Sequence, residues 1–506
     1  MSSGNPKAAF ESLAREFKEI NTLATCESIL GWDEVTYMPP GGAAHRASQK
    51  ELLAGMVHQR ATAPRINDWL SAVEASDMVK NGDPVAANVR ELRRGYDKMV
   101  KVPESLVREI TKETSLAHQV WVEARKNNDF KSFFPSLKKI IDLKKQQAEA
   151  VGYKKEPYDA LLDDYEPNTT SEQVAAVFTP LRKELVTVLD RIMGGSKKPK
   201  VEIVERTYPV AAQETFAEEA ARAIGYNFET GRLDVTTHPF CTQIGPGDVR
   251  ITTRYNEKRF NDAFFGVLHE AGHGIYEQSL PTEQFGLPLG EAASLGIHES
   301  QSRMWENAVG RSRAFWEYFF PTAKQAFPAA LGNVTLDEFY HAVNDVRPSF
   351  IRVEADEVTY NLHIMLRFEM ELALIRGDLK PEDAPAAWNE KFKDYVGLTP
   401  PDDRMGCLQD VHWSAGLFGY FPTYALGNLY CAQFFAQAEK DLGDLSARFR
   451  KGSFGELRKW LNEKIHVHGR RYPAPELVKR VTGAPLSAEP LLSYLKAKFY
   501  PLYGVA

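Results

Sequence analysis

Two histidines four residues apart, with a glutamate beside the first, are the residues in this chain best placed to do chemistry. They are His269, Glu270 and His273, in the stretch FNDAFFGVLHEAGHGIYEQ at residues 260–278. Residues at i and i+4 lie one above the other on a helix, so both imidazoles can reach one metal ion while the glutamate points beside it, toward a bound water. This H-E-x-x-H pattern predicts a zinc site that carries its own general base.

The neighbouring residues decide between this metal site and an ordinary helix whose two histidines are hydrogen-bonded in the core. Most of the neighbours are apolar, which predicts a buried helix, and Asn261 or Asp262 is expected to cap it. Burying three ionisable groups on neighbouring turns costs free energy unless a metal or partner groups compensate for it. We therefore favour the metal site.

A third protein ligand is expected, because a catalytic zinc usually has three and leaves one position for water. The segment ASLGIHESQSRMWENAVG supplies Glu299, 26 residues after His273. Glu277, Glu291 and Glu306 are competitors that spacing alone does not exclude. A third ligand at Glu277, on the same helix as the first two, would crowd the metal. We predict Glu299 as the third ligand.

The rest of the sequence predicts the elements that must position these residues. Apolar residues at helical spacing dominate residues 1–195, as in PESLVREITKETSLAHQVWVEARK, and the helical pattern returns over 262–506. Between them, KVEIVERTY, GRLDVTTH and DVRITTRY are short, β-branched segments that predict a small sheet at about 200–255. We expect one large, mainly α unit over residues 1–506, with two lobes around a groove.

The last of these segments, DVRITTRY at 248–255, has a possible role in binding. A strand edge beside a zinc helix can hold an extended peptide by main-chain hydrogen bonds and present its carbonyl to the metal. A purely structural hairpin explains the pattern equally well, so both interpretations stay open.

Composition excludes several classes of function. The chain has 506 residues, 43% of them hydrophobic, and a formal net charge of −6 without strong blocks of either sign, which indicates a globular protein with no nucleic-acid or acidic-membrane partner. The N-terminal sequence lacks the pattern of a signal peptide and no window reaches 18 apolar residues, which predicts a cytoplasmic location. The four cysteines are far apart and predict neither a disulfide framework nor a zinc ribbon.

Six short motifs in one order resemble the carboxypeptidase Taq family of metallocarboxypeptidases. They are HPF at 238–240, DVRIT at 248–252, HEAGH at 269–273, HESQSR at 298–303, IRVEAD at 351–356 and GCLQDVHW at 406–413. The N-terminal LGWDEVTYMPPGGAAHRA also resembles the family's opening hairpin, so the resemblance extends over essentially the whole chain.

The resemblance implies a mainly helical fold similar to neurolysin and angiotensin-converting enzyme, with a deep groove, a small sheet at its wall and usually a homodimer. It implies release of single residues from the free C-termini of peptides, with zinc or cobalt supporting activity. Carried over by motif, His269, His273 and Glu299 are the metal ligands. Glu270 is the base that takes a proton from the attacking water and later gives it to the leaving amine.

A second donor is needed for the oxyanion that forms during attack. The segment DVHWSAGLFGYFPTY at 410–424 offers His412, Tyr420 and Tyr424, and related zinc peptidases use a histidine and a tyrosine from such a segment. We favour His412 and Tyr420, with Tyr424 as the alternative and as a substrate contact. The same residues could instead be an aromatic core segment with satisfied hydroxyls.

An enzyme that acts at chain ends must also recognise the free α-carboxylate, for which a guanidinium is well suited. Arg352 is the candidate in the motif IRVEAD, with Arg347 and Arg250 as competitors. Taken alone, Arg352 could equally be a surface arginine paired with a nearby acid. In the DVRIT motif, Asp248 and Arg250 are expected to pair and shape the groove wall, and His238 is expected to face the substrate.

Three other functions compete with this interpretation. A helical di-iron protein would combine Glu270 and His273 with a second Glu-x-x-His pair, Glu463 and His466. A non-catalytic scaffold would bind metal only structurally, although such sites normally have four ligands and often cysteines. An endo-acting zinc oligopeptidase would use the same chemistry and differ only in the groups that bind the substrate terminus.

Overall fold

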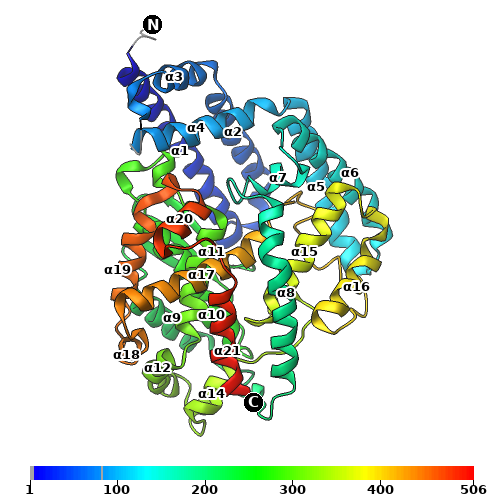
Figure 1. Cartoon of the computed structure of the whole chain (residues 1–506), viewed down its shortest axis with the longest axis vertical. Helices are drawn as coiled ribbons and strands as arrows, with labels where there is room; N and C mark the ends of the chain where they lie inside the picture. The colour runs from blue at the N-terminus through cyan, green and yellow to red at the C-terminus, as the bar shows by residue number, and fades with distance from the viewer. Residues whose placement is uncertain (1–4, 81–83, 506) are drawn as a thin grey trace.

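Helices make up most of the structure, a computed structural model that describes residues 5–80 and 84–505 (Figure 1). The helices before the sheet are α1 Pro6–Thr36, α2 Ala43–Ala61, α3 Pro64–Glu74, α4 Pro84–Lys101, α5 Glu104–Asn127, α6 Phe130–Val151, α7 Pro157–Leu162, α8 Ser171–Met193 and α9 Val210–Ile224. The helices after it are α10 Phe260–Ser279, α11 Leu295–Arg303, α12 Arg313–Ala326, α13 Pro328–Leu331, α14 Leu336–Val343, α15 Thr359–Arg376, α16 Ala384–Val396, α17 Pro422–Leu442, α18 Leu445–Phe449, α19 Gly455–Lys464, α20 Ala474–Thr482 and α21 Glu489–Tyr503. The predicted mainly α fold is confirmed.

The described residues form one small sheet beside α10, as predicted. Its strands are β1 Gly231–Val235, β2 Cys241–Gly245 and β3 Asp248–Thr253, in the order β1-β3-β2. β1 runs parallel to β3, and β2 runs antiparallel to it. Because β3 lies in the middle, both of its edges are already paired, so DVRITTRY cannot offer an edge to a peptide. Of the two interpretations left open, the structural hairpin is therefore the one that fits.

The prediction of a strand at KVEIVERTY was wrong, because Val201–Ile203 forms only a short 3-10 turn. Its β-branched and aromatic residues serve core packing instead: Ile203 and Tyr208 are buried, and the Tyr208 hydroxyl donates to the Ile203 carbonyl at 2.6 Å. The third strand is β2, CTQIG, which the sequence analysis missed because it has few β-branched residues.

Helix α10, which carries the H-E-x-x-H pattern, is buried around most of its circumference. It begins at Phe260, so the predicted caps Asn261 and Asp262 lie inside its first turn, and no side chain caps it. The reason is that the Phe260 amide donates to the Val204 carbonyl at 2.9 Å, so a neighbouring loop satisfies a group that a cap would otherwise satisfy.

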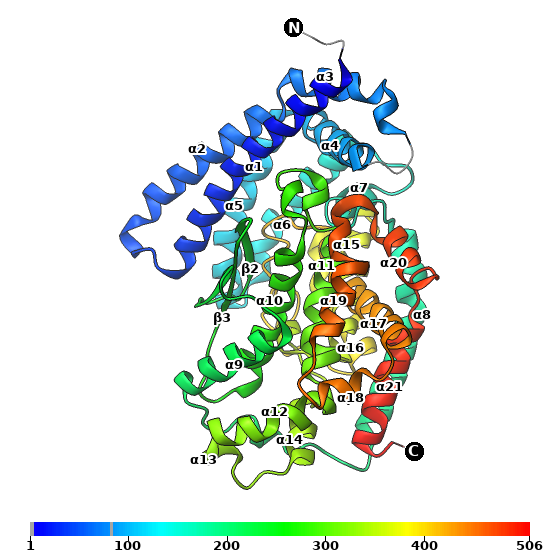
Figure 2. The same ribbon diagram turned by 90° about the vertical axis from the view of Figure 1, so that its left-hand side faces the viewer.

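Two glycines allow α10, α11 and α17 to pack unusually close together, and the three helices lie side by side in Figure 2. A Cβ atom at Gly272 of α10 would lie 2.6 Å from the Gln301 carbonyl oxygen and from the Ser302 Cα of α11. A Cβ atom at Gly427 of α17 would lie 2.5 Å from Cγ of Glu299. Only glycine fits at either position, so the backbone of α11 is enclosed by its two neighbours.

The N-terminal hairpin of α1 and α2 projects from the body of the molecule beside the sheet (Figure 2). Trp32 of α1 lies against the guanidinium groups of Arg232, at 5.0 Å, and Arg250, at 4.2 Å. The Tyr37 hydroxyl donates to the Asp234 carboxylate at 2.5 Å. These contacts fix the end of α1 on β1 and β3 through cation–π and polar interactions.

Across residues 5–80 and 84–505, no helix is both long enough and apolar enough to span a membrane.

The packing of α10 on α11 predicts opposite effects for one substitution at two positions of the same helix. Gly272→Ala should destabilise the protein by about 1–3 kcal/mol, because the new methyl group meets backbone that cannot move cheaply. Gly266→Ala should be neutral or stabilising by roughly 0.5–1 kcal/mol, because its Cβ would meet only the Thr253 hydroxyl at 3.7 Å. Urea denaturation of both variants measures the difference, and equal free energies of unfolding would contradict it.

Candidate functional site

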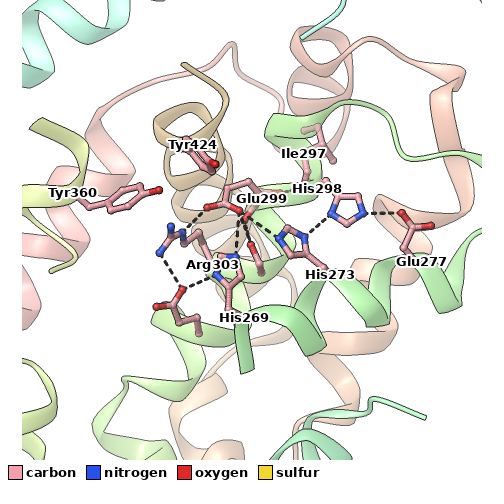
Figure 3. Close-up of polar contacts among 12 residues, drawn as sticks. His269, His273, Glu277, Ile297, His298, Glu299, Arg303, Tyr360 and Tyr424 are labelled. Atoms are coloured by element: carbon pink, nitrogen blue, oxygen red, sulfur yellow. Dashed lines mark hydrogen bonds and ion pairs between the residues drawn. The ribbon is translucent and has the colours of Figure 1, made fainter. Parts of the chain in front are cut away.

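The structure brings His269, His273 and Glu299 together on the facing sides of α10 and α11. Glu299 Oε2 lies 3.6 Å from Nε2 of His269 and 3.5 Å from Nε2 of His273, and the three ligand atoms all lie within 4.8 Å of one another. Figure 3 shows the Glu299 carboxylate facing both imidazoles.

These spacings fit a shared metal ion better than direct hydrogen bonds. Ligand atoms about 2.0–2.2 Å from a tetrahedral zinc ion stand about 3.3–3.6 Å apart, which includes the observed separations of 3.5 and 3.6 Å. The separations are too long for good hydrogen bonds. The donor set of two imidazoles and one carboxylate also matches that of known catalytic zinc sites.

Glu306 and Arg303 hold the side chains of His269 and Glu299 in place. The Nδ1 atom of His269 lies 2.8 Å from Glu306 Oε2, and Arg303 donates to Glu299 Oε1 at 2.7 Å and to Glu306 Oε2 at 3.0 Å. Glu306 belongs to a π-helix, Met304–Gly310, that directly continues α11; such segments occur frequently at functional sites.

His273 has a different partner on its Nδ1 atom. That atom lies 2.5 Å from Nδ1 of His298, and Nε2 of His298 lies 2.7 Å from Oε1 of Glu277 (Figure 3). Both ligand imidazoles therefore have Nδ1 occupied by a neighbouring side chain, which leaves Nε2 free for a metal.

Three buried carboxylates, Glu270, Glu299 and Glu306, lie close to the two histidines. Arg303 pairs with Glu299 and Glu306, and Arg311 lies 3.6 Å from Glu306. Burial raises the pKa of Glu270 to about 7. Burial would also raise the pKa of Glu299, but Arg303 and the two histidines outweigh it and hold that pKa well below its usual range. Glu299 therefore stays ionised, and its carboxylate beside the two imidazoles favours a cation at the position that they share.

Glu166 fixes the start of the helix that carries Glu299. It is fully buried, and its carboxylate accepts hydrogen bonds from the Ser294 hydroxyl at 3.0 Å, the Gly296 amide at 3.0 Å and the Tyr430 hydroxyl of α17 at 2.9 Å. Ser294 in turn caps α11 by accepting from the Ile297 amide. Burial raises the pKa of Glu166 to about 7. This carboxylate therefore ties α11 to α17.

His412, Tyr420 and Tyr424 also come together, as the sequence analysis expected. Nε2 of His412 lies 3.5 Å from the Tyr424 hydroxyl, and the rings of His412 and Tyr420 are 5.5 Å apart. Tyr424 precedes Gly427 by three residues on α17, so it lies on the face of that helix that packs against Glu299. Burial lowers the pKa of His412 to about 4, helped by Arg352 and Arg367, so its imidazole is neutral near pH 7.

A second buried carboxylate, Glu371, holds the loop that carries His412. It accepts from the Trp413 indole at 3.1 Å, the Gly419 amide at 3.0 Å and the Tyr158 hydroxyl at 2.8 Å. The loop is therefore fixed on both sides of its turn by one side chain of α15.

Arg352 is buried beside Tyr424 rather than exposed at the surface. Its guanidinium lies 5.2 Å from the Tyr424 ring, donates from Nε to Asp410 at 2.9 Å and donates from Nη1 to the Tyr360 hydroxyl at 3.1 Å. Asp410 also pairs with Arg367 at 2.6 Å. Two guanidinium groups thus share one carboxylate, and the cluster keeps a positive charge.

The other predicted substrate contacts have different surroundings. Arg250 uses Nε and Nη2 on Asp248, at 2.8 and 2.7 Å, so the expected pair is present. Arg347, the competitor of Arg352, is half exposed and pairs with Asp345 at 2.5 Å. His238 lies on an exposed bend after β1.

Comparison with known proteins decides the family. Residues 12–499 match the model of the family described as carboxypeptidase Taq (M32) metallopeptidase. The chain belongs to this family. Thermostable carboxypeptidase 1 of Thermus thermophilus is 50% identical over 99% of this chain and 100% of its own length. Carboxypeptidase 1 of Bacillus subtilis is 37% identical over 96% of this chain and 97% of its own.

Solved structures of the family have the same fold. The M32 carboxypeptidase of Deinococcus radiodurans has a TM-score of 0.95 at 41% identity and covers 98% of this chain and 100% of its own. Metallocarboxypeptidase 1 of Trypanosoma cruzi has a TM-score of 0.92 at 36% identity over 98% of this chain and 100% of its own. The protein is therefore a metallocarboxypeptidase, which confirms the family and activity that the motifs implied.

The metallocarboxypeptidase does not use the second Glu-x-x-His pair that a di-iron protein would require. Glu463 is exposed on α19 and its nearest cation is Lys459 at 3.8 Å, while His466 is buried and contacts the Gln301 amide at 2.8 Å. Glu291, which competed for the third ligand position, pairs with Arg470 at 3.0 Å.

Several residues that matter in this carboxypeptidase site were missed by the sequence analysis. His298 and Asp410 lie inside the quoted motifs HESQSR and GCLQDVHW. His298 directly precedes Glu299 and Asp410 precedes His412 by two residues, and this closeness could have identified them. Tyr360 follows IRVEAD by four residues, which is one turn of helix. Glu166 and Glu371 had no local signal, because their partners are distant in the sequence.

The candidate metal site predicts different outcomes for one substitution at two of its glutamates, Glu270 of α10 and Glu299 of α11. Glu299→Gln should weaken metal binding, whereas Glu270→Gln should retain it, because only Glu299 shares the metal position with the two histidines. A ligand at 100 times its Kd adds about 2.7 kcal/mol to stability, so zinc should raise the Tm of chelator-treated wild type and Glu270→Gln. An equal rise of the Tm in Glu299→Gln would show that Glu299 is not a metal ligand.

Proposed function

We propose that the protein is a zinc-dependent carboxypeptidase that releases single amino acids from the C-termini of peptides with broad specificity, and that Co²⁺ can replace Zn²⁺. The observation that supports action at the chain end is the buried positive cluster of Arg352, Arg367 and Asp410, which lies beside Tyr424. A free α-carboxylate would balance its charge.

His269, His273 and Glu299 would hold the metal, which when bound supplies Lewis acidity to the water and to the scissile carbonyl. Glu270 acts as the general base. Its side chain forms no hydrogen bond or ion pair with any residue in 5–80 or 84–505, and its raised pKa of about 7 suits proton transfer near neutral pH. It takes a proton from the attacking water and then gives it to the leaving amine.

His412 and Tyr424 are the proposed donors to the oxyanion, with Tyr420 beside them. The His412 imidazole is neutral near pH 7, so it can donate a hydrogen bond to the oxyanion without placing a positive charge beside the substrate before the reaction. Tyr424 is preferred to Tyr420 because it lies on the face of α17 that contacts Glu299. Tyr420 packs edge-on against Tyr165, which fixes its ring.

Arg352 and Tyr360 would bind the terminal carboxylate. Nη1 of Arg352 donates to the Tyr360 hydroxyl, whose own proton then remains for an incoming oxygen. Arg303 lies 4.5 Å from the Tyr360 ring, and in Figure 3 both Tyr360 and Tyr424 lie on the opposite side of Glu299 from His298. Arg250 would shape the wall of the site, and His238 would contact the substrate from the loop after β1.

We also propose a cytoplasmic location and a homodimer. All four cysteines are free, including the exposed Cys26, which suits a reducing compartment. The family resemblance supports the dimer, and α2 exposes apolar surface at Leu52 and Met56 that a second subunit could cover.

The terminal-carboxylate proposal predicts that an N-blocked peptide is cut only as its free acid. Its last residue should be released, chelation should stop the release, and Zn²⁺ or Co²⁺ should restore it. The matching C-terminal amide should be stable. Chromatography of the products measures both, and Glu270→Gln, which keeps the metal, serves as the inactive control. Comparable cleavage of the amide would favour an endo-acting oligopeptidase with the same metal chemistry.

Arg352→Lys should lower kcat/KM for the free acid by about 10- to 100-fold, the effect of losing one hydrogen bond to a charged group. Lysine keeps the charge, but its N–H donors lie on a single atom and cannot span Asp410 and Tyr360 as Nε and Nη1 of Arg352 do while also reaching a carboxylate. Arg404→Lys is the matched control, because Arg404 is exposed and pairs with Asp402 at 2.8 Å. Steady-state kinetics of both variants on one substrate gives the comparison. An equal kcat/KM in the two would show that another residue binds the terminal carboxylate of the substrate.

A further inference from the structure

The two ligand histidines are supported in different ways. His269 contacts a carboxylate directly, through Nδ1 and Glu306 at 2.8 Å. His273 reaches its carboxylate through a second imidazole, because His298 lies between Nδ1 of His273, at 2.5 Å, and Glu277, at 2.7 Å. Figure 3 shows these three side chains in a row that leads away from Glu299.

Hydrogen bonding allows one arrangement of protons along this row when His273 binds a metal. His273 must keep the lone pair of Nε2 for the metal, so Nδ1 carries the proton and donates it to His298. Nδ1 of His298 is then an acceptor, which places the proton of His298 on Nε2. That Nε2–H donates to Glu277. Each bond in the row therefore fixes the tautomer of the next ring.

Glu277 has no other charged partner in the part of the chain that the structure describes, since its carboxylate is ion-paired only with His298. Its side chain is 15% exposed and that of His298 is 17% exposed, so both groups are partly shielded from water. The negative charge of Glu277 is thus directed along His298 toward His273.

We propose that His298 and Glu277 are positioning residues for His273, which hold its ring and tautomer so that Nε2 faces the metal. This inference rests on the proposed metal site. A carboxylate that acts through a histidine in this way raises the basicity of the ligand nitrogen, and such outer partners typically change metal affinity by about 10- to 100-fold.

A merely structural role is the competing explanation, because His298 also joins α11 to α10. His466 provides the matched control: it is a buried histidine that packs on the same Tyr276 ring, at 4.8 Å against 5.3 Å for His298, and contacts α11 through Gln301. It makes no contact with the ligand set. A cavity at His466 should disturb the packing of these helices without altering the row.

The test measures Zn²⁺ affinity by competition with a chromophoric chelator, with the Tm of each variant as a check of folding. His298→Ala should bind Zn²⁺ about 10- to 100-fold more weakly than wild type. His298→Asn should recover part of the loss, because its side-chain oxygen can replace Nδ1 as the acceptor for His273. His466→Ala should change the affinity by less than about twofold. Equal losses in His298→Ala and His466→Ala, or no recovery with asparagine, would overturn the proposal.

A double-mutant cycle tests whether Glu277 acts through His298. Glu277→Gln should weaken Zn²⁺ binding in the wild-type background and have no further effect in His298→Ala, since the intermediate ring is gone. The same loss in both backgrounds would show that Glu277 acts independently of His298, which would refute the proposal that it acts on His273 through that ring.

The metal site itself is tested separately. His269→Ala should abolish stoichiometric Zn²⁺ binding. Unchanged binding in His269→Ala would refute the metal site of the proposed function, whereas loss in His269→Ala with unchanged affinity in His298→Ala would refute only the positioning role.

Discussion

The cluster of buried carboxylates between α10 and α11 is the constraint on which the rest of the structure depends. Glu270, Glu299 and Glu306 are held within a low-dielectric region where each unpaired charge is costly. Arg303 offsets part of that charge by pairing with two of them. Glu299 keeps its negative charge between the two imidazoles, so the same groups that favour a bound cation also limit how α10 and α11 can be packed.

The region around Arg352 follows the same principle with the opposite sign. Asp410 is shared by two buried guanidinium groups, and the site keeps a positive charge that only an incoming anion balances. The two charged regions meet at Tyr424. In the proposed function, the terminal carboxylate of a peptide binds on the positive side, and the metal held by His269, His273 and Glu299 would attract the scissile carbonyl on the other. Glu166 and Glu371 keep the two regions in register by bonding to the segments that carry Glu299 and His412.

How much the sequence revealed depended on how local each interaction is. His269, Glu270 and His273 were found because helical periodicity alone sets their geometry, and Glu299 because the next helix follows directly. The prediction of a strand at 200–208 was wrong because β-branched residues also pack in the cores of helical proteins. Asp410 was missed because its role depends on contact with Arg352, 58 residues away, whereas Tyr360 is only eight residues from Arg352 and was missed although it is close in the sequence. Neither Glu166 nor Glu371 differs in local sequence from a surface glutamate, so only the folded chain distinguishes them.

The three proposed metal ligands lie a short distance apart along the chain. All three lie within residues 269–299, so bringing them together closes only a short loop at little entropic cost. The loop that carries His412 is instead held by Glu371, whose bond to Tyr158 joins residues 213 positions apart. Contacts of such separation form late. Helix α11, which carries Glu299, is held in turn by Glu166, whose bond to the Gly296 amide joins residues 130 positions apart. The proposed ligands thus meet across a short loop, but their exact placement, like that of His412, needs contacts between distant parts of the chain.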